Sequence, residues 1–414
     1  MDVLIIGGGI GGLTLGLMLH KRGIPCRIFE AAPEIKPLGV GINILPHASK
    51  ELCELGLEAD LARVAVTTAN ARYFNRFGQL IYVEPLGRNA GYDWPQFSIH
   101  RGDLHEVLLD AFVARAGRDR YLTGWQCTRI DQDGDGATAH FQHPVTREAL
   151  EPRRGAVAIG CDGIHSAVRK QLYPEEGPPI YSGVNMWRGV IPWQPILDGA
   201  SMTRVGWLTT GKMVLYPIRN NIDAQGRQLM NWVWEIETTK YKQWDWSRPG
   251  RLEDFIDGAK DWHFDWLDVP AFFRTAETIL EYPMVDKDPV ARWSFGRITL
   301  LGDAAHPMYP RGSNGAGQAI LDARALADRL AGSPDWPVAL ADYEALRLPA
   351  TAKVVHTNRS TPPDAILREV YQRTGDKPFK NIDDVIGREE LAGIVDAYKR
   401  VAGYTKEGLR AGGR

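Results

Sequence analysis

Residues 2–12 read D-V-L-I-I-G-G-G-I-G-G, and this stretch decides the fold. Its first half, Asp2–Ile6, is apolar and rich in β-branched residues, which predicts a buried parallel strand. Its second half has the spacing G-x-G-x-x-G. A helical pattern follows over Leu13–Lys21, and a second strand is predicted over Pro25–Phe29, with the acid Glu30 at its end. Strand, glycine turn, helix, strand and acid in this order predict a βαβ unit that binds a dinucleotide.

The glycines have separate roles in such a unit. Gly7 allows the tight turn, Gly9 lets a pyrophosphate approach the backbone, and Gly12 lets the helix pack closely on the strand. The N-terminus of the helix offers free N–H groups and a partial positive charge to the pyrophosphate. Glu30 is placed to bind a ribose hydroxyl. This stretch does not separate FAD from NAD, and a glycine-rich turn in an unrelated α/β domain is the alternative.

Length and composition narrow the class of protein. The chain has 414 residues, enough for two domains that share an interface, and 44% of them are hydrophobic and 24% charged, as in soluble globular proteins. A net charge of −2 gives no reason to expect a nucleic-acid partner. Four scattered cysteines without a C-x-x-C argue against a disulfide framework or a structural metal site, and suit the cytoplasm. We expect no targeting segment and no membrane span.

The middle of the chain, residues 181–289, differs from the N-terminal part because most of the thirteen tryptophans lie in it. Its pattern predicts a helix and three strands of a separate, mainly antiparallel sheet: Arg251–Ala259, Asn185–Ile191, Met213–Ile218 and Leu229–Ile236. Alternation along the last strand places Met230, Trp232, Trp234 and Ile236 on one face. The parallel-strand pattern returns at Arg297–Leu301.

The predicted fold is therefore α/β, with a split Rossmann-like domain, an inserted antiparallel sheet and a helical tail. We predict the boundaries 1–180 and 290–360 for the two parts of the dinucleotide-binding domain, 181–289 for the substrate-binding sheet, and 361–414 for the tail. Further predicted elements are a helix at Pro46–Leu55, a hairpin at Ala71–Val83, a strand and helix over Phe97–Leu109, strands at Gly124–Arg129, Ala137–Phe141 and Ala156–Gly160, and helices at Gln318–Leu330, Ala365–Thr374 and Arg388–Ala402. Glu34–Ile44 is a glycine-punctuated loop, in which Gly39 and Gly41 either approach a flat ligand or form an ordinary turn.

A second set of residues bears on the cofactor. Asp162 and Asp303 each follow a predicted strand, at the sheet edge where ligands bind, and Gly312–Gly317 begins another helix. Two acids and two helix N-termini are more than NAD requires. FAD has a ribityl chain, whose hydroxyls suit Asp303. It also has a flavin edge that becomes negative on reduction, which suits the N–H groups around Asn314–Ala316.

These motifs resemble three fingerprints of the single-component FAD-dependent aromatic hydroxylases, the para-hydroxybenzoate hydroxylase class. The matching stretches are Gly7–Gly12 with Glu30, Cys161–Arg169 (C-D-G-I-H-S-A-V-R), and Arg297–Pro307 with Pro310, Gly312 and Asn314-Gly315. Within the class the chain is most similar to the phenazine-carboxylate monooxygenases, through Pro37–Ile44, Ser98–Leu104, Met186–Val190 and Tyr282–Pro289. It departs from the class at Cys161 and Arg311, and its tail beyond Thr361 shows no obvious match.

The resemblance implies roles for a set of residues, which we take together with Gly41 as candidate cofactor contacts. They are Gly11 and Gly12 at the FAD pyrophosphate, Glu30 at the adenosine ribose, Arg101 at the pyrophosphate or ribityl region, the backbone of Cys127 near the adenine, Asp162 near the pyrophosphate, Asp303 at the ribityl chain, and the N–H groups of Gly315 and Ala316 at the flavin pyrimidine edge. From the residues alone, Arg101 at a strand-to-helix junction suits a capping or surface arginine better, and the resemblance reverses that preference.

The substrate is expected between the flavin and the inserted sheet. The candidate lining residues are Trp187, Arg188, Tyr216, Trp232, Trp234, Tyr309 and Arg311. Only one face of a strand can meet a substrate, so core packing is the alternative for each aromatic residue. Arg188 and Arg311, if they face inward, favour an aromatic or heteroaromatic carboxylate through bidentate pairing. No side chain is assigned as a catalytic acid or base, and His306 is expected to be structural.

The resemblance implies that NAD(P)H reduces FAD and that O2 then forms a flavin C4a-hydroperoxide, which hydroxylates an aromatic ring. It does not distinguish NADH from NADPH. The alternatives are an FAD-dependent oxidase or dehydrogenase on the same fold, a redox-sensing flavoprotein that binds a partner through its tail, and an NAD-dependent dehydrogenase without flavin. A homodimer is a further possibility for the tail.

Overall fold

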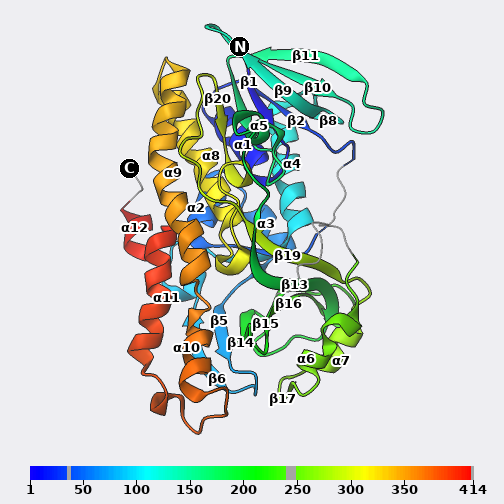
Figure 1. Cartoon of the computed structure of the whole chain (residues 1–414), viewed down its shortest axis with the longest axis vertical. Helices are drawn as coiled ribbons and strands as arrows, with labels where there is room; N and C mark the ends of the chain where they lie inside the picture. Colours follow the sequence, from blue (N-terminus) through cyan, green and yellow to red (C-terminus); the bar gives the residue numbers. More distant parts are fainter. Residues whose placement is uncertain (35–38, 239–248, 412–414) are drawn as a thin grey trace.

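The computed structural model describes residues 1–34, 39–238 and 249–411. Two lobes are stacked along the long axis, and the last helices run beside both of them (Figure 1). The first lobe is built on a five-stranded parallel sheet in the order β20-β12-β1-β2-β8. Its strands are β1 (Val3–Ile6), β2 (Cys26–Glu30), β8 (Tyr121–Thr123), β12 (Val157–Gly160) and β20 (Ile298–Leu300). Since β20 follows the inserted sheet in sequence, the parallel sheet is completed by a distant part of the chain.

The predicted βαβ unit is present. α1 (Ile10–Lys21) connects β1 to β2, and all four residues of β1 are buried, which explains its uninterrupted apolar run. α4 (Arg101–Ala116) and α8 (Gly315–Gly332) pack on α1. The approach of α1 to α4 is close, because a Cβ at Gly16 would lie 2.7 Å from the Phe112 ring. This packing carries the N-termini of α1 and α8 to the same edge of the sheet.

The second lobe is built on a seven-stranded sheet in the order β19-β13-β16-β15-β14-β5-β6. Its strands are β5 (Asn70–Phe74), β6 (Leu80–Pro85), β13 (Ile180–Trp193), β14 (Ser201–Trp207), β15 (Gly211–Arg219), β16 (Gln228–Glu237) and β19 (Leu280–Asp286). The pairing of β5 with β14 is parallel and the other pairings are antiparallel. The hairpin β5–β6 therefore belongs to this sheet, although it lies within residues 1–180.

In this lobe a strand was missed and one predicted helix differs from the structure. β14 was not predicted, because all seven of its residues are buried and its sequence S-M-T-R-V-G-W does not alternate. The helix predicted over Arg251–Ala259 is a 3-10 turn (Leu252–Asp254) followed by the short α6 (Ile256–Ala259). The remaining small elements here are β17 (His263–Phe264), β18 (Leu267–Asp268) and α7 (Val269–Arg274).

Two smaller sheets have three strands each; the first packs on the parallel sheet of the first lobe, and the second also contacts β15 of the second lobe. One is antiparallel, with strands β9 (Gln126–Gln132), β10 (Ala137–Gln142) and β11 (Ala149–Gly155); the other consists of β3 (Gly41–Ile44), β7 (Phe97–His100) and β4 (Val66–Thr67). Three further helices belong to the first lobe: α2 (Pro46–Glu54), α3 (Glu58–Val64) and α5 (Ala167–Leu172). The loop predicted over Glu34–Ile44 is wrong for Gly41–Ile44, which form β3, and its residues 35–38 lie outside the described residues.

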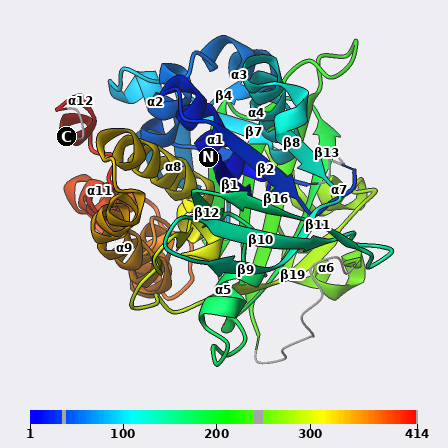
Figure 2. The same cartoon turned by 90° about the horizontal axis from the view of Figure 1, so that it is seen from above.

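The C-terminal helices run along one side of both lobes (Figures 1 and 2). They are α9 (Trp336–Ser360), α10 (Ala365–Thr374), α11 (Arg388–Ala402) and α12 (Lys406–Arg410). The predicted limits of α10 and α11 are confirmed, because each helix has a strong amphipathic pattern whose apolar residues are buried. α10 packs on β14 and α11 packs on β6 and α9. Among the described residues, no helix combines the length and hydrophobicity needed to cross a bilayer.

Candidate active site

A first cavity lies at the carboxyl ends of the parallel strands, where open α/β sheets bind ligands. Its lining brings together six of the residues predicted to contact the cofactor: Gly7, Gly9, Glu30, Arg101, Cys127 and Asp162. They come from the ends of β1, β2 and β12, from the start of α4, and from β9. Residues almost 160 positions apart in sequence thus meet at one edge of the sheet.

The glycines of the turn have two different roles. Gly9 leaves room for a ligand, whereas Gly7 and Gly12 allow close packing within the protein. Gly7 has a φ of +107°, and a Cβ there would lie 2.4 Å from the Cys161 carbonyl oxygen. A Cβ at Gly12 would lie 2.0 Å from the Gly7 carbonyl oxygen, so α1 packs directly on the turn. Gly11 faces Leu301 and lies, like Gly12, outside the cavity lining. A Cβ at Gly9 would have no atom of the described part of the chain within 4 Å, so this glycine leaves space in the cavity.

Both acids of this cavity are held by backbone N–H groups. Glu30 accepts hydrogen bonds from the N–H groups of Gly8 (2.7 Å) and Ala32 (2.8 Å). Asp162 accepts hydrogen bonds from the Ser166 hydroxyl and from the first N–H groups of α5. Burial raises the pKa of the Asp162 carboxyl, and these hydrogen bonds oppose the rise. Glu30 therefore braces the glycine turn, and Asp162 braces the start of α5, at the edge of the cavity.

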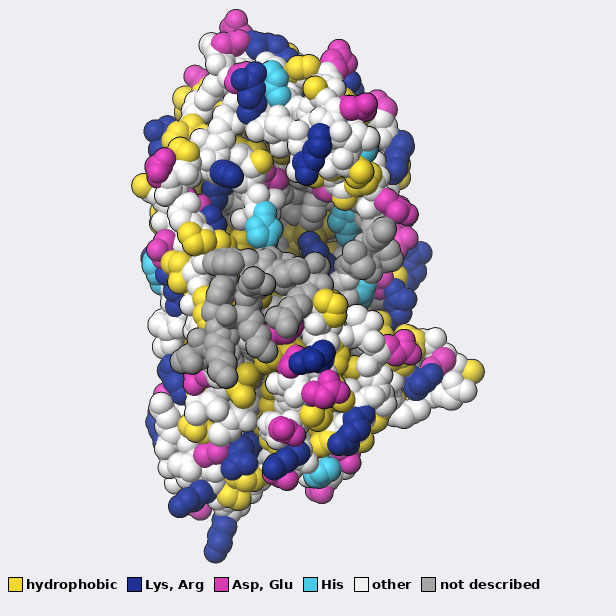
Figure 3. Space-filling model, turned by 45° about the vertical axis from the view of Figure 1, so that its right-hand side comes forward, with side chains coloured by type: hydrophobic (Ala, Val, Ile, Leu, Met, Phe, Trp, Pro, Cys, Tyr) yellow, Lys and Arg dark blue, Asp and Glu magenta, His cyan; other side chains and the backbone are white. Residues whose placement is uncertain are grey.

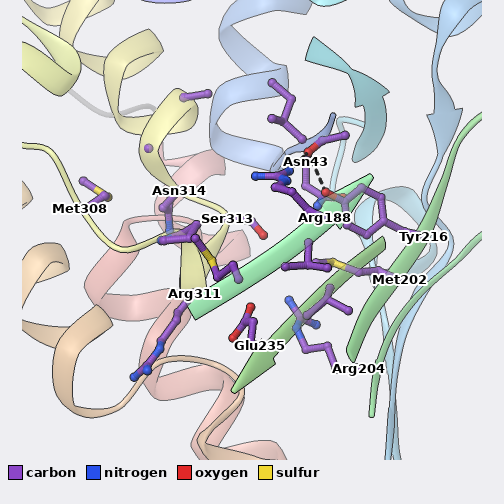
Figure 4. A pocket seen from close by; sticks show the side chains of 18 of the residues that line it. Asn43, Arg188, Met202, Arg204, Tyr216, Glu235, Met308, Arg311, Ser313 and Asn314 are labelled. Atoms are coloured by element: carbon purple, nitrogen blue, oxygen red, sulfur yellow. Dashed lines mark hydrogen bonds between the residues drawn. The ribbon is translucent and has the colours of Figure 1, made fainter. Parts of the chain in front are cut away.

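A second cavity lies between the seven-stranded sheet and the loop that leads into α8 (Figure 4). The lining includes Gly41, Asp303, Arg311, Gly315 and Ala316. α8 begins at Gly315, three residues before the predicted start, so its first turn faces the cavity. Asn314 occupies the N-cap position, yet its side chain forms no capping hydrogen bond. The first N–H groups of α8 thus remain available to an acceptor in the cavity.

The sheet presents alternate residues of four strands to this cavity. The β-register aligns Arg188 with Val233, Val233 with Val214, and Val214 with Arg204, and all four line the cavity. Three strand spacings separate the Cα atoms of the two arginines, which is about 14 Å. An apolar strip two residues wide therefore has a guanidinium group at each end.

Arg188 and Tyr216 are fixed against the first lobe by one carbonyl. The Gly41 oxygen accepts hydrogen bonds from Arg188 Nη2 (3.0 Å) and the Tyr216 hydroxyl (2.9 Å), and Asn231 Oδ1 accepts one from the Gly41 N–H (2.7 Å). Arg188 Nε is buried and has no hydrogen-bond partner among the residues that the structure describes. Burial lowers the pKa of the Arg188 guanidinium, whose ordinary value is so high that the group stays charged. A carboxylate would satisfy both its charge and its free donors.

Two cations of the site were missed by the sequence analysis. Arg204 donates a hydrogen bond to the Tyr73 hydroxyl (3.2 Å). Lys212 donates to Glu235 (2.8 Å) and to Asp364, which precedes α10, and all three side chains of this ion cluster are buried. The signal in the sequence was a single charge inside an apolar strand, K-M-V-L-Y in β15 and T-R-V in β14.

Four of the predicted lining residues lie outside the lining of this cavity. Trp187, Trp232 and Trp234 lie on the opposite face of the sheet from the cavity, where they pack with residues of α6 and α7. Trp187 and Arg188 are adjacent in one strand, so they cannot face the same side. Tyr309 is buried beside the ion pair of Asp286 and Arg359 and does not line the cavity.

Asp303 and Arg101 connect the two cavities electrostatically. The Asp303 side chain is exposed at the cavity, but the protein around the cavity removes it from bulk water. This desolvation raises the pKa of its carboxyl. The positive charge of Arg101 opposes this rise in pKa. Arg101 lines the first cavity, so its charge influences a residue of the second. Figure 3 shows the surface hollowed between the lobes, with basic and histidine side chains at the rim.

His306 is structural, as predicted. Its ring is buried and forms a hydrogen bond with Asp322 of α8, which also accepts hydrogen bonds from Arg347 (2.7 Å) and the Gly302 N–H (3.1 Å). His306 is absent from the lining of both cavities. The strand end of β20 is thereby tied to α8.

Residues 1–358 match the FAD binding domain family, and the chain belongs to it. The wider class is that of flavoprotein monooxygenases that act on aromatic rings, which use FAD together with NAD(P)H and O2. The chain is 42% identical over 406 residues to the phenazine 1,6-dicarboxylic acid hydroxylase PhzS of Lysobacter antibioticus, covering 97% of each chain. It is 35% identical to the 3-amino-4-hydroxybenzoate 2-monooxygenase PtnB3 of Streptomyces platensis, covering 86% of each.

Solved structures support the same fold. HpxO of Klebsiella pneumoniae, solved with FAD and uric acid, has a TM-score of 0.72 at 24% identity, over 100% of this chain and 95% of that one. CtdE, solved with FAD and a substrate, has a TM-score of 0.75 at 18% identity, over 97% and 98% of the two chains. The combination of a split parallel sheet and a second, mainly antiparallel sheet is thus found in proteins of very different sequence.

Proposed function

We propose that the two cavities together bind FAD, and that the second also binds an aromatic or heteroaromatic substrate with at least one carboxylate, which the enzyme hydroxylates. The observation that carries the proposal is the row Arg188–Val233–Val214–Arg204 opposite the free N–H groups of α8. A flat apolar ring suits the valines, and an anionic substituent suits either arginine. The names of the relatives, a phenazine dicarboxylic acid hydroxylase and an aminohydroxybenzoate monooxygenase, fit a substrate of this class.

The proposed cofactor contacts follow the two cavities. Gly7, Gly9 and the start of α1 would hold the pyrophosphate, with Glu30 near the adenosine ribose and the backbone of Cys127 near the adenine. Asp162 and Arg101 would border the same region. In the second cavity Asp303 would bind the ribityl chain and the N–H groups of Gly315 and Ala316 the flavin edge. The open position at Gly9 and the uncapped first turn of α8 support this assignment.

FAD supplies hydride acceptance from NAD(P)H and the activation of O2, and the chain supplies position and electrostatics. The N–H groups at the start of α8 would stabilise the negative charge of the reduced flavin edge. Val214, Val233 and Met202 line this cavity and would exclude water from the reacting ring. Arg188 would orient the substrate through its carboxylate. No side chain of the cavity is assigned as an acid or base.

Substitution of Gly9 by Val tests the cofactor site. The backbone at Gly9 has φ −75° and ψ −170°, which valine adopts without strain, and a Cβ added there has no atom of the described residues within 4 Å. It would occupy the space assigned to the pyrophosphate. We expect the variant to fold with the stability of the wild-type apoprotein and to lose FAD binding by at least about 100-fold, about 2.7 kcal/mol.

The matched control is Gly177→Val, which also adds a valine side chain into open space but lies outside both cavities. FAD binding by each apoprotein is measured from the quenching of flavin fluorescence, and stability from chemical unfolding. If Gly9→Val binds FAD as Gly177→Val does, the pyrophosphate does not lie at the glycine turn.

The reaction itself is tested with a panel of aromatic carboxylates. A monooxygenase consumes NAD(P)H in proportion to hydroxylated product when the correct ring is present. An oxidase on the same fold would release peroxide with every ring.

We also propose that residues 1–180 without the hairpin β5–β6, together with residues 290–360, bind the dinucleotide. Residues 181–289 with that hairpin would hold the substrate. A cytoplasmic location and a homodimer are further predictions, the latter checked by light scattering.

A further inference from the structure

The C-terminal segment reaches the start of α8 through buried polar side chains. Tyr398 of α11 lies beyond the residues that match the family, which end at 358. Its hydroxyl accepts a hydrogen bond from Asn314 Nδ2 (3.1 Å) and donates one to Asn358 Oδ1 (2.7 Å). Asn314 is the residue that precedes the N–H groups of Gly315 and Ala316. A side chain of the tail thus contacts the residue that begins the proposed flavin-binding turn.

The other side of Asn314 is held by α2. His47 Nε2 lies 2.9 Å from Asn314 Oδ1. Burial lowers the pKa of His47 to about 4, so the ring is neutral at pH 7. Because Asn314 donates through Nδ2 to Tyr398, its Oδ1 faces His47, which must donate through Nε2–H. The chain of donors therefore runs in one direction, from His47 through Asn314 and Tyr398 to Asn358, whose Nδ2 donates to the Tyr309 carbonyl (3.0 Å).

This network is buried, which leaves little freedom to its members. His47, Asn314 and Asn358 are 0% exposed and Tyr398 is 1% exposed. Buried polar groups that lose a partner are costly to leave unsatisfied, so the four side chains fix one another. Because its side chain is bonded to His47 and Tyr398, Asn314 does not cap its own helix, although asparagine is among the preferred capping residues.

The loop before α8 is shaped around the same phenol. A Cβ at Gly312 would lie 1.5 Å from the Tyr398 hydroxyl oxygen and 2.8 Å from Asn358 Oδ1. Only a glycine backbone fits against the phenol at this distance. The position of the loop and the orientation of Asn314 are therefore both set by Tyr398, through contact in one case and through a hydrogen bond in the other.

We propose that Tyr398 is a positioning residue for the flavin, which acts by holding Asn314 and thereby the first N–H groups of α8 toward the second cavity. This inference rests on the proposed assignment of Gly315 and Ala316 to the flavin edge. It gives the C-terminal segment a role in the active site of its own chain. The tail closes the back of the cofactor loop and does not itself line the cavity at Tyr398.

The test replaces Tyr398 by Phe, which keeps the ring and removes the hydroxyl. The matched control is Tyr92→Phe, because the Tyr92 hydroxyl also holds the tail, through a hydrogen bond to the Tyr404 carbonyl (2.7 Å), and forms no hydrogen bond with the described residues of the α8 loop. A second variant, His47→Phe, removes the donor at the other end of the network and keeps a ring to stack on Tyr404, 5.2 Å away. For each apoprotein the unfolding temperature and the FAD affinity are measured. For each holoenzyme we record the flavin absorption spectrum, the reduction potential and the ratio of hydroxylated product to peroxide.

We expect Tyr398→Phe and His47→Phe to weaken FAD binding about two- to tenfold, as the loss of one neutral hydrogen bond does. Both should also shift the flavin spectrum and potential and raise the share of peroxide. Tyr92→Phe should lower only the unfolding temperature. The inference is overturned if Tyr398→Phe matches Tyr92→Phe in FAD affinity, spectrum and potential. If Tyr398→Phe does not fold, unchanged flavin properties in His47→Phe overturn it equally. A wild-type apoprotein that does not bind FAD contradicts the proposed function, and this inference with it.

Discussion

The two faces of the seven-stranded sheet are made by neighbouring residues of the same strands, yet they have opposite characters. One face carries Trp187, Trp232 and Trp234, which pack with Phe255 and Phe273 in a cluster of rings. The other carries the charged and apolar residues that line the second cavity (Figure 4). Side chains in a strand point alternately to the two sides of the sheet. Of two neighbouring residues, one therefore belongs to the core and the other to the site.

The enzyme uses one face of the sheet for stability and the other for recognition. The aromatic face buries large apolar surfaces and holds the sheet on α6 and α7. The cavity face contains Arg188, Arg204, Lys212 and Glu235, charges that are costly to bury and that only partners or ligands satisfy. The rigid aromatic side thus holds the strands that position the charged side.

The largest effect is expected on the aromatic face. Trp234→Ala removes a fully buried ring, and we expect a loss of about 3–5 kcal/mol in the free energy of unfolding. Chemical unfolding of the apoprotein measures it. The control Trp336→Ala removes a half-buried ring at the start of α9 and should cost less. If Trp234→Ala leaves stability unchanged but weakens substrate binding, the two faces have been assigned the wrong way round.

A smaller effect, which depends on pH, is expected on the cavity face. Burial opposes ionisation of Asp364, but Lys212 and Arg311 outweigh it and hold the pKa of its carboxyl below the usual value. A lowered pKa in the folded state stabilises the protein above the unfolded pKa, near 3.9, and this stabilisation is lost as pH falls through the folded pKa.

Asp364→Asn should therefore lower the free energy of unfolding by about 2 kcal/mol at pH 7, as the loss of a charge-assisted hydrogen bond does. The difference from wild type should shrink as pH falls below about 4. Unfolding by urea at a series of pH values measures it. Trp234→Ala serves as the control, because its deficit should change little over the same range. A deficit in Asp364→Asn that is constant with pH would show that Asp364 is not ionised in the folded protein.

The smallest expected free-energy change concerns recognition. Arg188→Met keeps the length of the side chain and removes its charge, and we expect KM to rise about tenfold, about 1.4 kcal/mol, for a carboxylate substrate. KM for the uncharged amide analogue should change much less. Arg274→Met, an exposed arginine of α7 on the other side of the sheet, is the control. Equal effects of Arg188→Met on acid and amide would place the carboxylate elsewhere, and Arg204 would then be the first alternative.

Much of the fold could be predicted because its signals are local. The glycine turn, four of the five strands of the parallel sheet (all but β8) and the helices α10 and α11 each follow from patterns within a few residues. The alternation of Met230, Trp232 and Trp234 on one face was likewise predicted correctly. Which side of the sheet that face lies on was not predicted correctly. Alternation shows which residues share a side, but it does not show which side meets the cofactor.

Other features depend on contacts between distant segments. β14 has no alternation to reveal it, since both of its faces are buried. Lys212 and Asp364 are 152 positions apart, and their pairing requires the tail to pack on the sheet. The same holds for Tyr398 and Asn314, which are separated by 84 positions.

The sequence by itself determined the βαβ unit, the split parallel sheet, the helical tail and the class of cofactor, because turn geometry and hydrophobic periodicity are written into short stretches. Only the tertiary structure decided that Arg188 and Arg204 face the cavity while Trp187 does not, and that the tail holds the start of α8 through Tyr398. The physical reason is that burial and hydrogen bonding between distant residues depend on how whole elements pack, which no local pattern specifies.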